Sequence, residues 1–141
     1  MKNLWQKELR KVLSDAERIV ILGIGNQQKG DDGAGAICAE LFAKQLKNRL
    51  PQKIKIINGG EVPENYTGEI RKFPPTHVVI IDACRARKRP GTIFLVNKKK
   101  FSNEDVSTHR LPLSMLVQFL EETIGCKVII IGIEPKSLAW T

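Results

Sequence analysis

Cysteine is scarce in this chain and shows no pattern of a disulfide framework or a zinc site. Its three cysteines, Cys38, Cys84 and Cys126, are widely separated and include no Cys-x-x-Cys pair. The N-terminal stretch MKNLWQKELRK also lacks the apolar core of a secretory signal peptide. These absences favour a reducing compartment, and we expect a cytoplasmic protein.

Long apolar runs and aromatic residues are equally sparse. No run approaches the roughly 18 apolar residues that a spanning helix needs, so we expect no membrane partner. The chain has 23 Lys and Arg against 15 Asp and Glu, a net charge of +8, which brings acidic partners and nucleic acid into consideration. Only 6% of its residues are aromatic, and the densest lysine run, residues 98–100, has few aromatics around it, which weakens single-strand nucleic-acid binding.

Apolar periodicity in the 141 residues predicts one domain that alternates helices and strands. Helical spacing recurs near residues 2–15, over about 33–50 and over 113–124. We expect Gly125 to end the last helix. In the second helix we expect one buried face made of Ile37, Cys38, Leu41, Phe42, Leu46 and Leu50. Four Val/Ile-rich runs lie between the helical segments and a fifth follows the last: RIVILGI, KIKIING, HVVIIDA, TIFLVN and KVIIIGIE.

Continuous apolar strands are typical of a sheet buried on both faces. We therefore predict an α/β fold, a three-layer α/β/α sandwich with a mostly parallel, about five-stranded central sheet. Residues 1–141 would form a single domain with an N-terminal helical extension over about 1–16. Because no helix separates TIFLVN from HVVIIDA, we expect these two strands to be antiparallel at an edge.

The loop GIGNQQKGDDGAG, residues 23–35, follows the first strand where nucleotide-binding loops often lie, yet it fails their patterns. Gln28 stands where the dinucleotide motif requires glycine, and Asp31 and Asp32 replace the Lys and Ser/Thr of a P-loop. Two carboxylates at a helix N-terminus repel a phosphate and favour a cation. We interpret Asp31 as a helix cap, whereas Asp32 either complements the helix dipole or contributes to a site.

Three side chains could meet at one end of the sheet. Asp32 and Asp82 both follow parallel strands, whose carboxyl ends form ligand sites in open α/β sheets, and His109 lies in the loop before the last helix. Each has an ordinary alternative role, as a loop cap or an incidental histidine. Together they form an oxygen and nitrogen ligand set that suits a divalent transition metal. Cys84 pairs with no base in a recognisable motif, so we expect a buried thiol.

Five motifs in order resemble one known family: GIGNQQKGDDGAG, NGGEVPEN, VVIIDA, STHRLPL and IIGIEP. From about Arg18 to Glu134 the chain is similar to the maturation endopeptidases of nickel-iron hydrogenases, in the branch that acts on formate-hydrogenlyase-type large subunits. The resemblance implies removal of a short C-terminal extension from the hydrogenase large-subunit precursor after nickel insertion. Nickel of the precursor would be the recognition signal; whether it also takes part in hydrolysis, and whether the endopeptidase binds it only transiently, are alternatives that stay open.

The resemblance also implies roles for particular residues. The family's metal-contacting and catalytic positions fall on Asp32, Asp82 and His109, which implies an aspartyl-type endopeptidase. Asn26 matches the asparagine of the glycine-rich loop, and Gly59 and Gly60 match a glycine pair, with substrate binding as the implied role. Relatives generally continue past the GI-P strand into a further helix. Either this chain is shortened there, or its N-terminal helix replaces part of that cover.

Two alternatives to an endopeptidase stay open at this point. One is a nickel-sensing maturation chaperone that uses the same three residues without cutting. The other is a basic nucleotide- or nucleic-acid-binding α/β protein, which the charge motivates and the failed phosphate motifs oppose. We predict the endopeptidase, with the precursor as partner, no nucleic acid, and an oligomeric state that the sequence does not determine. Lys98, Lys99 and Lys100 could help to dock the precursor.

Overall fold

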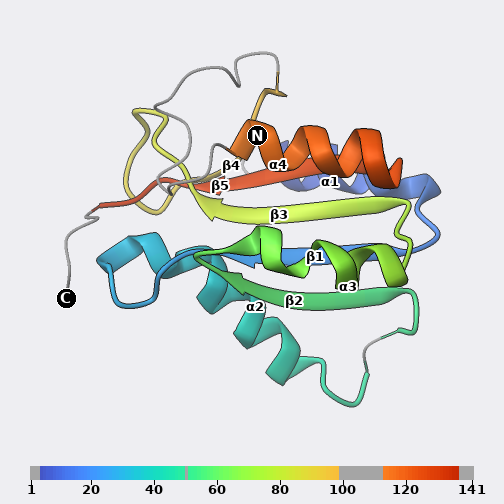
Figure 1. The fold of residues 1–141 in the computed structure, drawn as a ribbon. Helices are drawn as coiled ribbons and strands as arrows, with labels where there is room; N and C mark the ends of the chain where they lie inside the picture. The colour runs from blue at the N-terminus through green and yellow to red at the C-terminus, as the bar shows by residue number, and fades with distance from the viewer. Residues whose placement is uncertain (1–3, 50, 99–112, 137–141) are drawn as a thin grey trace.

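The central sheet has five strands in the order β2-β1-β3-β5-β4 (Figure 1). A computed structural model describes residues 4–49, 51–98 and 113–136. The strands β1 (Ile19–Ile24), β2 (Ile54–Gly60), β3 (His77–Ala83) and β5 (Lys127–Ile133) are parallel, and β4 (Ile93–Leu95) is antiparallel to β5. This arrangement confirms the predicted mostly parallel sheet.

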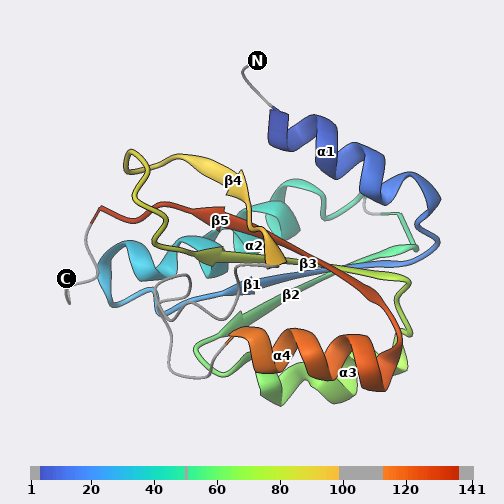
Figure 2. The ribbon, with the colours of Figure 1, turned by 90° about the horizontal axis from the view of Figure 1, so that it is seen from above.

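Helices cover both faces of the sheet, as Figure 2 shows. On one face lie α1 (Leu4–Val12), a 3-10 turn (Leu13–Asp15) and α2 (Ala34–Gln45); on the other lie α3 (Thr67–Lys72) and α4 (Leu113–Phe119), which a π-helical turn (Leu120–Ile124) continues. Leu22, Ile80 and Ile130 are fully buried in the layer under α3 and α4. The predicted three-layer sandwich is therefore confirmed. Within the described ranges, none of these helices has the length and apolar character to cross a bilayer.

Helix α2 differs from its prediction in length and in its buried face. It ends at Gln45, whereas we expected a helix to about residue 50, which lies outside the described residues. Its buried residues are small, namely Gly35, Ala36 and Ala39. A Cβ on Gly35 would lie 2.1 Å from the Ile81 carbonyl oxygen and 2.4 Å from that of Ile24. Because α2 packs this closely on β1 and β3, its large apolar residues are displaced outward, and Ile37, Leu41 and Phe42 are 42%, 49% and 38% exposed.

Strand β4 pairs with a different neighbour from the one we predicted. Its partner is β5, with Phe94 opposite Gly132, and not β3. The apolar strand β5 is buried along most of its length, so it takes the place beside β3. The three-residue β4 is partly exposed, as suits an edge strand.

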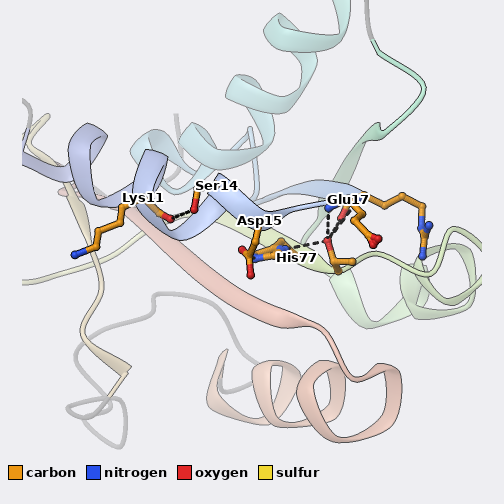
Figure 3. Close-up of polar contacts among 7 residues, drawn as sticks. Lys11, Ser14, Asp15, Glu17 and His77 are labelled. Atoms are coloured by element: carbon orange, nitrogen blue, oxygen red, sulfur yellow. Dashed lines mark hydrogen bonds and ion pairs between the residues drawn. The ribbon is translucent and has the colours of Figure 1, made fainter.

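The N-terminal helix is attached at the amino end of β3, opposite the end where we predicted a site (Figure 3). The Thr76 hydroxyl accepts a hydrogen bond from the Glu17 N–H (3.0 Å) and donates one to the Arg18 carbonyl (3.0 Å). The buried His77 places Nδ1 2.9 Å from Thr76 Oγ1 and Nε2 3.3 Å from Asp15 Oδ1. These contacts hold α1 where it covers part of the sheet face beside α2.

Candidate functional site

The candidate site lies at the carboxyl ends of β1 and β3. The chain runs from β1 through α2 to β2 on one side of β1, and then through α3 to β3 on the other side. The strand order reverses between β1 and β3, and such a reversal is where open α/β sheets bind ligands. Residues 25–33 follow β1 at this position, and Asp82 is the second-last residue of β3.

Asp32 is a buried carboxylate that holds the loop after β1. It lies in a 3-10 turn (Gly30–Gly33) and is 4% exposed. The backbone N–H of Asn26 donates a hydrogen bond to Asp32 Oδ2 (3.1 Å), and the Asn26 side-chain oxygen accepts one from the Gln28 N–H (2.9 Å). Asn26 and Asp32 are thus brought together, and Asp32 does more than complement the dipole of α2.

Glycines bring the backbone of this loop close to its neighbours. Gly25 has φ +148°, and a Cβ there would lie 2.0 Å from the Asp32 carbonyl oxygen. The Gly25 N–H donates a hydrogen bond to the Gly60 carbonyl at the end of β2 (2.8 Å). A register shift opposite Gly23 and Ile24 leaves Gly59 out of the pairing between β1 and β2. The glycine pair 59–60 therefore lies beside the Asn26–Asp32 loop.

Asp82 is fully buried, and its strand β3 lies next to this loop. The 3-10 turn that carries Asp32 contacts β3, and Asp82 pairs in register with Gly132 of β5. Cys84 is also fully buried; its burial, and then the negative charges of Asp82 and Glu134, raise the pKa of its thiol far above the ordinary value. A protonated, buried thiol is not a nucleophile, which agrees with our interpretation of Cys84.

His109, the third predicted ligand, lies outside the described residues, so the three-membered set stays a prediction. Within residues 4–49, 51–98 and 113–136, no group of three or more His, Cys, Asp or Glu side chains could hold a metal ion. The two carboxylates placed at one end of the sheet are oxygen donors, and an imidazole would add the nitrogen that nickel accepts readily. The predicted set of two carboxylates and one imidazole would suit a divalent transition metal.

The predicted cap role of Asp31 is wrong. The N-cap of α2 is Gly33, without a side-chain cap bond. The Asp31 carboxylate instead accepts a hydrogen bond from the backbone N–H of Lys136 (2.7 Å), after β5. The role is still structural, but its partner is 105 residues away, where no local pattern could indicate it.

Glu134 is a buried acid that our sequence analysis did not single out. It is 7% exposed, and its Oε1 accepts hydrogen bonds from the backbone N–H groups of Ala86 (2.8 Å) and Lys88 (3.1 Å). Its backbone also bonds to Gly91 and Thr92. The sequence pattern that could have identified Glu134 is an acidic residue directly after a buried apolar strand. Glu134 fixes the loop that follows Asp82.

Comparisons with known proteins agree with the motifs. A family profile described as hydrogenase maturation protease matches residues 38–140. The hydrogenase 3 maturation protease of Escherichia coli is 38% identical over 117 residues, which are 82% of this chain and 72% of that protein.

Two solved structures share the fold. The nickel-iron hydrogenase maturation protease HycI of Thermococcus kodakarensis has a TM-score of 0.82 and 38% identity, covering 94% of this chain and 83% of that one. The endopeptidase HycI of Escherichia coli has a TM-score of 0.72 and 34% identity, covering 87% and 76%. The chain therefore belongs to the hydrogenase maturation protease family.

Proposed function

We propose that this protein is the endopeptidase that removes the C-terminal extension of a nickel-iron hydrogenase large-subunit precursor after nickel insertion. One observation above all supports this: two buried carboxylates, Asp32 and Asp82, come from the ends of β1 and β3, where the strand order reverses. Its relatives are named hydrogenase maturation proteases. Its three cysteines are free thiols, as suits a reaction in the reducing cytoplasm.

In the proposed reaction, Asp32, Asp82 and His109 approach the nickel centre of the precursor and orient the scissile bond. A carboxylate or the nickel activates a water molecule, whose oxygen bonds to the peptide carbonyl carbon. The water's proton passes to the leaving nitrogen as the C–N bond breaks. The precursor chain would lie across Gly59 and Gly60, where the space beside Gly60 is open, with Asn26 holding the loop.

The burial of Asp32 and Asp82 limits how a precursor can reach them. Asp32 is 4% exposed and Asp82 is fully buried, so neither carboxylate is freely offered to solvent. Contact between Asp82 and a precursor requires neighbouring atoms to move aside when the precursor binds. The two carboxylates would then meet the precursor's metal centre in a site from which water is largely excluded, where their charges interact strongly with a cation.

The test is cleavage of nickel-loaded precursor, followed by mass spectrometry, by the variants Asp32→Asn, Asp82→Asn and His109→Ala. Loss of a group that positions or activates the water should slow cleavage by at least about 100-fold. Asp31→Asn is the matched control, because it neutralises the adjacent carboxylate but retains a side-chain oxygen for the Lys136 N–H, and it should cleave normally.

Full cleavage by all three variants would contradict the assignment. A stable complex of the wild-type chain with nickel-loaded precursor, without a shorter product, would favour the non-cleaving chaperone. Nickel-free precursor should stay uncut, and its cleavage at the full rate would remove nickel from the proposal.

A further inference from the structure

A strongly basic loop lies beside the candidate site. Four cationic residues, Arg85, Arg87, Lys88 and Arg89, fall within five positions, and all are exposed. The loop begins directly after β3 and Asp82, and Figure 1 shows it extending beyond the arrowhead of β3. The charges therefore lie at the same end of the sheet as Asp32 and Asp82.

This loop is held in place by its backbone. Glu134 accepts hydrogen bonds from the N–H groups of Ala86 and Lys88, and its own carbonyl accepts one from Gly91 (2.8 Å). The Lys88 ammonium lies 5.2 Å from the centroid of the Phe94 ring. A loop fixed in this way loses little further freedom when it binds a partner.

Arg87 adds evidence that the loop is used. Its φ is +59°, and it is the one non-glycine residue with a positive φ in the described parts of the chain. A long side chain in this left-handed conformation costs stability, and such costs are concentrated at functional positions. A glycine would fit the backbone better, but it would remove a guanidinium group from the centre of the basic segment.

The lysine run at residues 98–100 is a weaker candidate for docking. Lys98 already forms an ion pair with Glu121, with 2.6 Å between Nζ and Oε2, and Lys99 and Lys100 lie outside the described residues. In the basic loop, by contrast, the carboxylate of Glu134 is buried and engaged with backbone N–H groups. The arginine side chains at the loop surface can therefore attract an external acid.

We propose that residues 85–89, the basic loop, are the docking surface for an acidic segment of the hydrogenase large-subunit precursor; this inference rests on the proposed endopeptidase function. Guanidinium groups bind carboxylates in pairs of hydrogen bonds. Asp32 and Asp82 repel the same acidic segment and attract the precursor's cationic metal centre. Opposite charges on neighbouring surfaces thus fix the orientation in which the precursor binds.

Nucleic acid is the less suitable partner for the basic loop. Residues 84–91 contain no aromatic side chain on which a base could stack. The nearby Phe94 ring is already covered by Lys88. The loop therefore lacks the second component that single-strand binding surfaces combine with positive charge.

The test compares steady-state cleavage of nickel-loaded precursor by three variants of the full chain. Arg85→Gln/Arg87→Gln/Arg89→Gln should raise KM roughly tenfold, leave kcat within about twofold, and make kcat/KM less sensitive to salt. The control Lys44→Gln/Lys47→Gln/Lys53→Gln removes the same charge from exposed lysines near the opposite end of the sheet and should leave KM unchanged. Arg85→Lys/Arg87→Lys/Arg89→Lys keeps the charge and should recover most of the affinity.

Binding of the precursor, measured separately from cleavage, distinguishes the two proposals. If the wild-type chain binds the precursor without cutting it, and the Gln variant of the loop binds at least fivefold more weakly, docking stands and the endopeptidase proposal fails. If the Gln variant cleaves with an unchanged KM, or both triple Gln variants weaken binding equally, the docking proposal fails. Salt-sensitive binding of single-stranded RNA that only the Gln loop variant loses, with unchanged precursor kinetics, would also overturn it.

Discussion

Gly35 lies where helix α2 packs closely on β1 and β3, and Gly35→Ala should weaken both stability and cleavage. The added methyl group would lie 2.1 Å from the carbonyl oxygen of Ile81 and 2.4 Å from that of Ile24. Both atoms belong to the backbone of central strands, so no side-chain rotation can relieve the contact. Helix α2 must move away from β1 and β3, and the turn that carries Asp32 directly precedes it.

The expected magnitude follows from two opposing effects. Forcing a methyl group into a closely packed position typically costs about 1–3 kcal/mol, and two backbone contacts of this length favour the upper part of that range. The higher helix propensity of alanine returns up to about 1 kcal/mol. We therefore expect the free energy of unfolding to fall by about 2 kcal/mol, with a melting temperature about 4–8 °C lower.

Urea denaturation followed by circular dichroism would measure this loss, and Gly68→Ala is its matched control. Gly68 also lies near the start of a helix, α3, but a Cβ there meets no atom within 4 Å. This control should be neutral or stabilising by up to about 1 kcal/mol. Equal effects of the two substitutions, or an unchanged midpoint for Gly35→Ala, would refute the close packing of α2 on the strand ends.

Two further predictions concern the segment after β3. Arg87→Gly removes the cost of a side chain at φ +59° and should raise the free energy of unfolding by about 1 kcal/mol, measured by urea denaturation; a loss of stability would contradict the left-handed conformation. The pKa of Cys84 is raised above its ordinary value of 9.0 by burial and then by Asp82 and Glu134. Its contribution to stability is therefore complete below about pH 9 and is lost as pH rises towards the folded-state pKa, by up to about 1.4 kcal/mol per pH unit. Cys84→Ala should lose less stability than the wild type between pH 9 and pH 10.5, and identical pH profiles would contradict the shift.

Sequence patterns predicted the parts of the fold that depend on local periodicity and strand polarity. The buried strands, the order of helices and strands, and the position of Asp32 and Asp82 at one end of the sheet all follow from apolar runs and from the geometry of parallel strands. Gly125, predicted to end the last helix, caps it in the left-handed conformation with φ +79°.

What the patterns missed depends on contacts between distant segments. The prediction of the buried face of α2 was wrong, because the close approach of Gly35 to two strands overrides the tendency of Leu41 and Phe42 to be buried. The partners of Asp31 and Glu134 are backbone N–H groups 105 and 48 residues away, which no spacing rule indicates. The role of His109 stays a prediction from the family resemblance.

The strand order has a consequence for the time course of synthesis on the ribosome. Strand β5 follows β4 in the chain but lies between β3 and β4, so β4 has no partner and one edge of β3 stays open until residues 127–133 have emerged. Only then can the Glu134 carboxylate accept hydrogen bonds from the basic loop, and the Lys136 N–H donate one to Asp31. Residues 134–136 thus connect the two sides of the candidate site, and these contacts cannot form before residue 136 has been made.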